Sequence, residues 1–582
     1  MKNIESLKPY LKKYAFHFLF GLIALVIVDV LQLFIPEITG QIADGWREGT
    51  LSREGLYGKI GQIFILTIGI VLGRFVWRYF IFGTSRKIEY HMRNDLFAHW
   101  ETLSLRYFTE NKTGDLMAHA TNDLTAVRSA LGSGLMMAFD ALILTSLVIV
   151  RMATRVHPKL TMVAIIPLPL IAIGGLLFGI SVRKRFKEKQ DAFAQLTDHV
   201  QENFSGIRVI KAFVQETKEI QKFEKVNQYN FEKNMRLAKL FALMMPLAGG
   251  VAGLSMLIVM GYGGYLAMIG DISLGGFIIF IQYLEMLIWP MMALGWCINI
   301  LSQGMASQQR IQTIMNEKPD IYDRDTVQKI NSFTGKIEIK KLTFSYPRTK
   351  EPALKNITVK VEPGQTLALL GRTGSGKTTL MNLILRLYDP PKNTILIDGV
   401  DILDIPLRVL RKNIGYVPQD NFLFSDTIAR NIAFGKKEAT IEEIQEAAKR
   451  AKVHENIMNF PKQYDTVVGE RGVTLSGGQK QRVSMARAFI KDPAILILDD
   501  SLSAVDTQTE EEILYNLYYH RKKKTNIMIA HRISTIQRAD LIVVLEEGNI
   551  IEQGNHHTLL EQKGMYYEMY KKQLLEKQLE EV

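Results

Sequence analysis

The sequence predicts an all-α membrane domain followed by a soluble α/β domain. Long apolar runs fill residues 1 to about 310, whereas the remainder has the shorter runs of a soluble globular protein. The formal net charge is +12, and Lys and Arg concentrate beside the apolar runs. That placement is typical of cytoplasmic loops in a membrane protein, so we expect membrane lipid and no nucleic acid among its partners. The single cysteine, Cys297, excludes an internal disulfide and any multi-cysteine metal site.

The first apolar stretch, from about Tyr14 to Pro36, follows Lys8, Lys12 and Lys13 and therefore resembles a signal peptide. The stretch is too long for one, and no small-residue cleavage pattern follows it. We predict an uncleaved first membrane span.

Six segments reach the roughly 20 residues that a bilayer requires. They are residues 15–36, 61–83, 134–154, 159–181, 240–268 and 275–300. The predicted organisation is a six-helix membrane domain over 1–315, a polar linker over 316–335 and a soluble domain over 336–582.

The charge pattern predicts that the N-terminus and the soluble domain lie in the cytoplasm. The inner segment 182–239 opens with VRKRFKEK, as the positive-inside rule expects. The short outer connection between the third and fourth spans is an exception, because it carries Arg151, Arg155 and Lys159. We keep this orientation because the opposite one would place the whole second half outside the cell.

Both inner segments, 84–133 and 182–239, lack proline and are rich in helix formers. In the second, Gly206 near the middle predicts a turn between two helices that continue straight out of the membrane. About 25 residues of helix extend ~40 Å. We therefore expect two long rods with short elements at their tips, which can carry motion to the soluble domain; a coiled-coil dimerisation arm is the alternative.

Four charged residues, Asp29, Arg74, Asp140 and Glu285, fall inside apolar runs, where charge is costly. One interpretation is ion pairing inside the bundle, for example of Arg74 with Asp29 or Glu285. The other is a polar pathway, in which Glu285 and Asp140 are the candidate substrate residues and Glu285 attracts cationic solutes. Glu285 lies in YLEMLIWPMM, whose aromatic and methionine side chains can repack around varied apolar ligands, and in which proline is expected to kink the helix.

The soluble half contains a phosphate-binding loop. The strand-like run TLALLG leads into GRTGSGKTT, which the helix-like LMNLILRL follows. This is G-x-x-x-x-G-K-[ST] in its strand–loop–helix context, where backbone N–H groups and a helix N-terminus surround phosphate oxygens. Lys377 is expected to reach the β- and γ-phosphates of ATP, and the Thr378 hydroxyl to ligate Mg²⁺. The residues of the predicted loop are Gly371, Arg372, Thr373, Gly374, Ser375, Gly376, Lys377, Thr378 and Thr379.

A second strand-like run, ILILDD, ends in two adjacent aspartates. The first, Asp499, is predicted to hold Mg²⁺ directly or through water. Together these motifs predict an α/β P-loop ATPase domain.

LSGGQKQR, Leu475 to Arg482, lies just before that strand. With the phosphate-binding loop it resembles the signature of the ATP-binding cassette (ABC) transporter superfamily. The six spans ahead of the cassette resemble an exporter-type half-transporter, and the resemblance covers nearly the whole chain.

The resemblance implies roles for further residues. Tyr346 matches the aromatic that stacks on adenine, and Gln419 matches the glutamine that contacts Mg²⁺ and faces the membrane domain. Asp506 ends the segment that matches the D-loop, and His531 matches the switch histidine, a donor to the γ-phosphate. The signature residues match those that cap the γ-phosphate of the partner's ATP: Ser476, Gly477, Gly478 and Gln479.

The resemblance also implies contacts between the two halves. TGDLMAHATNDL and GIRVIKAFVQE resemble the coupling helices at the rod tips, and VVGERG at 467–472 resembles the segment that touches them. A chain's phosphate-binding loop and its signature then belong to different ATP sites, so a second half-transporter is required.

Asp500 departs from the family pattern, in which the residue after the Mg²⁺ aspartate is normally a glutamate that activates water. Aspartate is one methylene shorter, so we expect Asp500 to be a weak base, alongside Lys377 and His531 as catalytic residues. A weak base combined with an intact signature predicts a heterodimer whose partner has a glutamate and a degraded signature. A slow homodimer is the alternative.

The predicted function is ATP-driven export of amphipathic small molecules such as drugs across the cytoplasmic membrane, with ATP and Mg²⁺ as cofactors. The sequence as a whole most resembles the subunit with the weak ATP site in a bacterial heterodimeric multidrug exporter. A lipid flippase and a mainly regulatory ATP-binding subunit are the alternatives.

Overall fold

The computed structural model describes residues 7–328, 330–469, 472 and 474–580. The chain forms two units. Residues 1–102 and 111–317 make the membrane unit, and residues 103–110 and 318–582 make the ATP-binding unit. The chain therefore passes between the units three times.

The membrane unit is built from long helices, because its apolar runs contain few residues that stop a helix. Pro36, Pro246 and Pro290 all lie inside continuous helices. Short π-helical turns interrupt some of the helices at His119–Asp123, Ala130–Gly134 and Val259–Gly263. The helices are α2 (Lys8–Lys13), α3 (Ala15–Arg47), α4 (Arg53–Thr102), α6 (Thr113–Ala118), α7 (Leu124–Ser129), α8 (Leu135–Arg155), α9 (Pro158–Ile165), α10 (Leu168–Ser205), α11 (Ile207–Ala212), α12 (Glu216–Ile258), α13 (Gly264–Met268) and α14 (Leu274–Met315).

In the described part of the chain, five helical stretches are long and apolar enough to cross a membrane: Ala15–Arg47, Arg53–Thr102, Thr113–Arg155, Glu216–Met268 and Leu274–Met315. The predicted span 159–181 is not one helix. It falls on α9 and the start of α10, which are separated at Ile166 and Pro167. Proline lacks the N–H that would continue the helical hydrogen bonds, so this break is physically expected.

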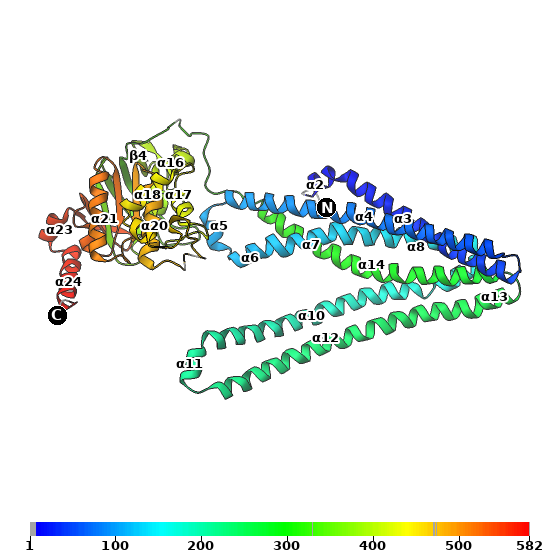
Figure 1. Ribbon diagram of the computed structural model, residues 1–582. Coiled ribbons are helices and arrows are strands. Elements are labelled where there is room, and N and C mark those ends of the chain that lie inside the picture. Colours follow the sequence, from blue (N-terminus) through cyan, green and yellow to red (C-terminus); the bar gives the residue numbers. More distant parts are fainter. Residues whose placement is uncertain (1–6, 329, 470–471, 473, 581–582) are drawn as a thin grey trace. The chain divides into compact units, whose positions relative to one another are not determined.

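The inner segment 182–239 forms the predicted rod. Helices α10 and α12 run side by side and are joined at the tip by Gly206 and the short helix α11 (Figure 1). Helix α10 ends at Gly206 as predicted, but α12 begins only at Glu216, and the short helix α11 lies between them.

Charged side chains of the membrane unit pair across helices. Arg151 on α8 lies 2.9 Å from the Glu37 carboxylate on α3, and the Tyr283 hydroxyl on α14 donates to the same carboxylate at 3.2 Å. Arg74 donates to the side-chain oxygen of Gln32 at 3.2 Å, although ion pairs with Asp29 or Glu285 are the contacts that the sequence suggests. The exceptional outer arginine at position 151 thus has a carboxylate partner.

The ATP-binding unit contains two sheets. The smaller has the order β2-β1-β4-β5, and the larger has the order β10-β9-β3-β8-β7-β6. In the larger sheet β9, β3, β8, β7 and β6 are parallel neighbours, and β10 is antiparallel to β9. The strands are β1 (Ile337–Phe344), β2 (Leu354–Val361), β3 (Thr366–Gly371), β4 (Ile395–Ile397), β5 (Val400–Asp401), β6 (Ile414–Val417), β7 (Ile495–Asp499), β8 (Thr525–Ile529), β9 (Leu541–Glu546) and β10 (Asn549–Gly554).

Strand β3 is buried along its whole length, because both faces of the larger sheet are covered. Leu367 and Leu369 pack into one core cluster, and Ala368 and Leu370 into the other. The helices of the unit are α5 (Leu105–Glu110), α15 (Lys377–Ile384), α16 (Leu407–Asn413), α17 (Ile428–Ala433), α18 (Ile441–Arg450), α19 (His454–Met458), α20 (Gly477–Phe489), α21 (Thr507–His520), α22 (Ile533–Ile536), α23 (His556–Gln562) and α24 (Met565–Glu580).

Helix α5 belongs to the ATP-binding unit, although it lies between α4 and α6 in sequence. Arg106 donates to both carboxylate oxygens of Asp320 at 2.7 and 3.0 Å, and Glu110 lies 3.2 Å from Arg348. The fully buried Arg386 donates to the carbonyl of Tyr322 at 3.0 Å. The polar segment that the sequence suggests as a linker is therefore anchored on this unit.

Candidate functional site

The larger sheet gathers most of the predicted ATP-site residues at one edge. Because β3, β8, β7 and β6 are parallel neighbours, their carboxyl ends lie at the same edge, where open α/β sheets bind ligands. The phosphate-binding loop follows β3, Asp499 ends β7, and Asp500 follows it. His531 comes two residues after β8, and the exposed Gln419 two residues after β6.

Glycines let the phosphate-binding loop turn tightly. Gly376 has φ +102°, and a Cβ there would lie 2.7 Å from a Leu354 methyl carbon and 2.9 Å from the Ala353 carbonyl. A side chain is therefore excluded by backbone conformation and by space. Directly after it, the Lys377 amine is buried and donates to the carbonyls of Gly371 and Arg372, at 2.8 Å each. Burial lowers the pKa of this amine.

Asp499 is almost fully buried at the end of β7. The Thr378 and Tyr416 hydroxyls lie close enough to its carboxylate to affect its pKa or their own. Burial, with the neighbouring Asp500 charge, raises the pKa of Asp499. Among the described residues no group of three or more His, Cys, Asp or Glu could hold a metal ion. A hydroxyl and a carboxylate oxygen still fit Mg²⁺, which uses few protein ligands and prefers oxygen.

Asp500 has a left-handed backbone, with φ +45°. Aspartate tolerates this region better than most residues. Its N–H donates to the Ile529 carbonyl at 2.9 Å, and its carbonyl accepts from the Ser503 hydroxyl at 3.0 Å. Asp500 and His531 line one cavity of about 110 Å³, and burial raises the pKa of Asp500. The structure therefore brings the predicted base and the predicted switch histidine together.

Tyr346 follows β1 of the smaller sheet and reaches the helix that begins at the phosphate-binding loop. Its hydroxyl donates to the Thr379 hydroxyl at 3.0 Å, and its ring packs edge-on against Tyr388 with centroids 5.1 Å apart. The predicted adenine-stacking residue is thus tied to the start of α15.

The signature forms the start of α20. Ser476 is its N-cap, and its hydroxyl accepts from the Gln479 N–H at 3.3 Å while the Gln479 side chain accepts from the Ser476 N–H at 2.9 Å. Gly478 is needed because a Cβ would lie 2.8 Å from the Ala504 carbonyl. One turn on, Gln481 accepts from the Ala504 N–H at 3.0 Å. These contacts couple the signature to the segment that leads from Asp500 to Asp506.

Sequence reasoning missed Tyr416 and Gln481. Tyr416 looks like an ordinary strand residue, although YVPQD places it three residues before Gln419. Gln481 lies inside the quoted signature motif but received no role. Of the expected segment 467–472, Glu470 and Arg471 lie outside the described residues.

The substrate candidates lie on the membrane unit. Glu285 is exposed on α14, where Trp289 and Trp296 are also exposed and pack edge-on with ring centroids 5.6 Å apart. Asp140 is half-buried on α8, beside the buried Asp29 of α3. Within the membrane unit the structure gives Glu285 and Asp140 as positions on two different helices.

Comparison with known proteins gives concordant results for the two halves. The family model of the ABC transporter transmembrane region matches residues 18–291, and the ABC transporter family model matches residues 354–503. The probable multidrug resistance ABC transporter ATP-binding/permease protein YheI of Bacillus subtilis is 40% identical, with 98% of each chain covered. The multidrug resistance-like ATP-binding protein MdlA of Escherichia coli is 37% identical, over 100% of this chain and 98% of the relative.

Two further similarities concern the substrate and the fold. The ATP-dependent lipid A-core flippase of Syntrophus aciditrophicus is 38% identical over 84% of this chain and 81% of its own length. A solved structure of a bacterial Atm1-family ABC exporter with ATP bound has a TM-score of 0.79 and 26% identity, covering 97% of this chain and 98% of the other.

Proposed function

Because this chain belongs to the ABC transporter family, we propose that it is the weak-site half of a heterodimeric exporter of amphipathic small molecules. The family assignment itself makes the chain an ATP-hydrolysing translocase and a multi-pass membrane protein that drives export. The proposal adds the division of labour between two subunits and the class of substrate. The observation that carries it is Asp500 beside His531, combined with an intact signature in the same chain.

We assign the sheet edge to one ATP, with Tyr346 on the adenine and the loop from Gly371 to Thr379 on the phosphates. Lys377 neutralises the β- and γ-phosphates, and His531 donates to the γ-phosphate. Thr378, Asp499 and Gln419 would hold Mg²⁺, which supplies charge neutralisation at the phosphates. The Tyr416 hydroxyl fixes the orientation of the Asp499 carboxylate.

Asp500 limits hydrolysis at this site. Its carboxylate is about 1.5 Å short of the position that a glutamate would reach, given the length of a C–C bond. Misplacement on that scale costs ~10²-fold in rate. The left-handed backbone, held by hydrogen bonds at both its N–H and its carbonyl, leaves the chain little freedom to move the carboxylate forward.

The intact signature, Ser476 to Gln479, serves the other ATP site in this proposal. A partner with a glutamate at the matching position then completes one site of full strength. The partner's own signature is free to degrade, because it faces the weak site. This arrangement explains why one chain keeps an intact signature beside a weak base.

The test is a pair of variants in the assembled transporter. Replacing the partner's glutamate by glutamine is expected to nearly abolish ATPase activity, whereas Asp500→Asn leaves much of it. If Asp500→Asn alone abolishes turnover, or if this chain alone forms a fast ATPase, the asymmetric assignment is wrong. A purified chain that hydrolyses ATP slowly with two weak sites would instead support the homodimer.

For the substrate, we propose that the exposed face of α14 lines the export pathway. Glu285 cannot face lipid tails without a large cost, and it shares this face with Trp289 and Trp296, at helical spacing of four and eleven residues. A carboxylate beside aromatic faces favours amphipathic cations. Asp140 contributes a second acidic position on α8.

Glu285→Gln tests this assignment, with Glu54→Gln at the exposed start of α4 as the matched control. We expect weaker transport of cationic compounds but unchanged transport of neutral ones, measured in vesicles with both kinds of dye. Unchanged transport and affinity for every compound would make Glu285 a structural residue.

Lipid export is the second candidate, favoured by the similarity to a lipid A-core flippase. Stimulation of ATPase by lipid alone, with no response to cationic compounds, would support it over drug export.

A further inference from the structure

The loop that carries His531 is held from two sides. On one side stands Glu510 of α21, which is 4% exposed. It lies 3.3 Å from the Arg532 guanidinium and accepts a hydrogen bond from the Thr535 hydroxyl. On the other side stands the C-terminal helix, α24, through the single side chain of Gln573.

The Gln573 amide makes two hydrogen bonds to the loop backbone. Its nitrogen donates to the His531 carbonyl at 2.7 Å, and its oxygen accepts from the Ile533 N–H at 2.8 Å. Both distances are those of well-formed hydrogen bonds. The amide thus bridges the residues on either side of Arg532 and fixes the backbone that the imidazole extends from.

The second hydrogen bond also satisfies the start of α22. Helix α22 begins at Ile533, whose N–H has no carbonyl within its own helix to bind. Ile533 is 1% exposed, so removing the acceptor leaves a buried donor unpaired. The loop conformation that carries His531 therefore depends on Gln573.

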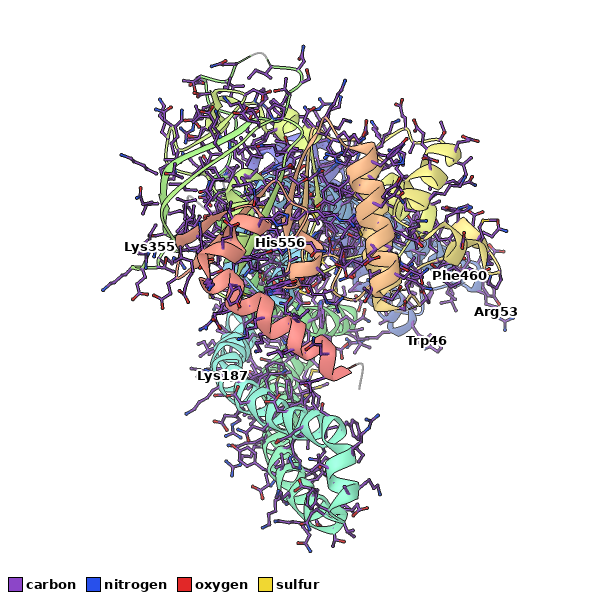
Figure 2. All side chains as sticks on the ribbon, turned by 90° about the vertical axis from the view of Figure 1, so that its left-hand side faces the viewer. Trp46, Arg53, Lys187, Lys355, Phe460 and His556 are labelled. Carbon is purple, nitrogen blue, oxygen red and sulfur yellow. The ribbon has the colours of Figure 1, made fainter. Side chains whose placement is uncertain are left out.

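The base of α24 is anchored to the body of the ATP-binding unit. The Tyr566 ring is fully buried, and its hydroxyl is 2.7 Å from Nδ1 of His556. The Tyr566 N–H donates to Glu552 at 3.1 Å. Figure 2 shows α24 continuing from the region of His556 along the surface, and Leu575 and Leu579 near its end are 51% and 77% exposed. Gln573 therefore lies between a fixed base and a solvated end.

We propose that Gln573 is a positioning residue for His531, by which the C-terminal helix sets how the switch histidine meets the γ-phosphate of ATP. The proposal rests on the role assigned to His531 under the proposed function. Gln573 acts through the His531 backbone, which it holds beside the cavity that His531 shares with Asp500. We expect that loss of Gln573 reduces the discrimination between ATP and ADP, because only ATP has a γ-phosphate.

The experiment uses the assembled transporter, labelled with 8-azido-ATP and analysed on the band of this chain. Competition by ATP-γ-S and by ADP is measured for the wild type and for Gln573→Leu, Gln573→Glu and His531→Ala. Gln578→Leu, an exposed glutamine on the same helix, is the matched control. We expect Gln573→Leu to weaken competition by ATP-γ-S roughly three- to tenfold, with competition by ADP unchanged. Gln573→Glu keeps the acceptor for Ile533 and should fall between the wild type and Gln573→Leu.

A double variant separates positioning from general damage. Gln573→Leu combined with His531→Ala should be no weaker toward ATP-γ-S than His531→Ala alone, because both changes remove the same contact. The proposal is wrong if Gln573→Leu weakens competition by ATP-γ-S and by ADP equally, or weakens neither. It is also wrong if the losses of the two single variants add fully in the double variant. If His531→Ala itself leaves discrimination intact, the assigned role of His531 fails, and this proposal fails with it.

Discussion

The two units of the molecule fix their polar groups in different ways. In the ATP-binding unit, Asp499, Asp500 and His531 meet because parallel strands end at one edge, so the sheet backbone sets their positions. In the membrane unit, Arg151 and Glu37 meet as side chains from separate helices. An ion pair between helices can break and re-form without loss of backbone hydrogen bonds, whereas a strand end cannot move without disrupting the sheet.

The largest effect is expected at Lys377, because its amine is both buried and aimed into the phosphate-binding loop. Lys377→Ala removes the buried cation of the phosphate-binding loop, and we expect ATP turnover to fall by about two orders of magnitude. The measurement is steady-state ATPase of the assembled transporter, with Lys350→Ala on an exposed loop as the control. Wild-type activity would show that the phosphate-binding loop is misplaced.

Gly376→Ala tests whether the backbone of the phosphate-binding loop is rigid, as expected if the backbone sets the positions of the ATP-site residues. The added methyl group meets Leu354 and the Ala353 carbonyl at a left-handed residue, so we expect ATP affinity to fall by about tenfold or more. Gly399→Ala is the matched control, because Gly399 has φ +84° and nothing lies within 4 Å of the added carbon. Equal ATP affinities in the two variants would mean that the loop yields and the backbone does not fix the site.

Asp500→Glu sharpens the account of the weak site. In the proposed heterodimer, changing the partner's glutamate to glutamine would leave only this chain's site able to hydrolyse ATP. In that background we expect Asp500→Glu to raise single-turnover hydrolysis by up to about tenfold, since it extends the carboxylate by one methylene. No gain would show that the left-handed backbone, and not carboxylate length, limits the site.

In the membrane unit the corresponding change is Asp123→Asn. Asp123 receives two hydrogen bonds from Arg310 of α14, one of them 3.0 Å long, and lies 2.7 Å from His119. We expect a loss of about 1–2 kcal/mol in stability, read as a lower melting temperature of the detergent-solubilised protein. Asp115→Asn, on the exposed first turn of α6, is the control. If Asp123→Asn lowered ATP affinity as much as Gly376→Ala, the expectation that ATP affinity depends on the backbone of the ATP-binding unit would be wrong.

The smallest effect is expected at Asp320, whose ion pair with Arg106 is partly exposed. The Arg106 hydrogen bonds lower the pKa of Asp320 below its ordinary value of 3.8. The pair therefore stabilises the fold at pH values above about 4, and this contribution is lost as the pH falls through the lowered pKa. Asp320→Asn should cost under about 1 kcal/mol at pH 7 and less at an acid pH below the ordinary pKa, by melting temperature at both pH values. An equal cost at both values would point to lost packing and not to charge.

Asp499 and Asp500 could be placed at the sheet edge from the sequence, because they directly end the apolar strand-like run ILILDD. His531 also follows such a run, IMIA, but its assignment depends on the resemblance to the family and not on the run itself. The rod was also predictable, since one glycine interrupts a long helical pattern at Gly206. In these cases the local sequence pattern marks where a strand or a helix ends, and that end also sets where the residue lies in space.

Gln573 could not be predicted, because 42 residues separate it from His531 and its helix reads as solvated. Arg386 is fully buried, and its guanidinium donates to three backbone carbonyls and one carboxylate. The local sequence LILRLY does not indicate these four acceptors, and the three carbonyls come from other segments. The break at Pro167 had a visible signal in IIPLPL, but the apolar run around it favours a continuous span. Contacts between distant segments decide the positions of Gln573 and Arg386, and periodicity does not record them.

Helix α5 has a consequence for how this protein can be dissected. A fragment that begins at Lys318 would contain every strand of the ATP-binding unit but none of residues 103–110. Its Asp320 and Arg348 would lose Arg106 and Glu110 as partners and face water instead. The gene segment that encodes the soluble half is therefore not the same as the part of the molecule that folds as that half.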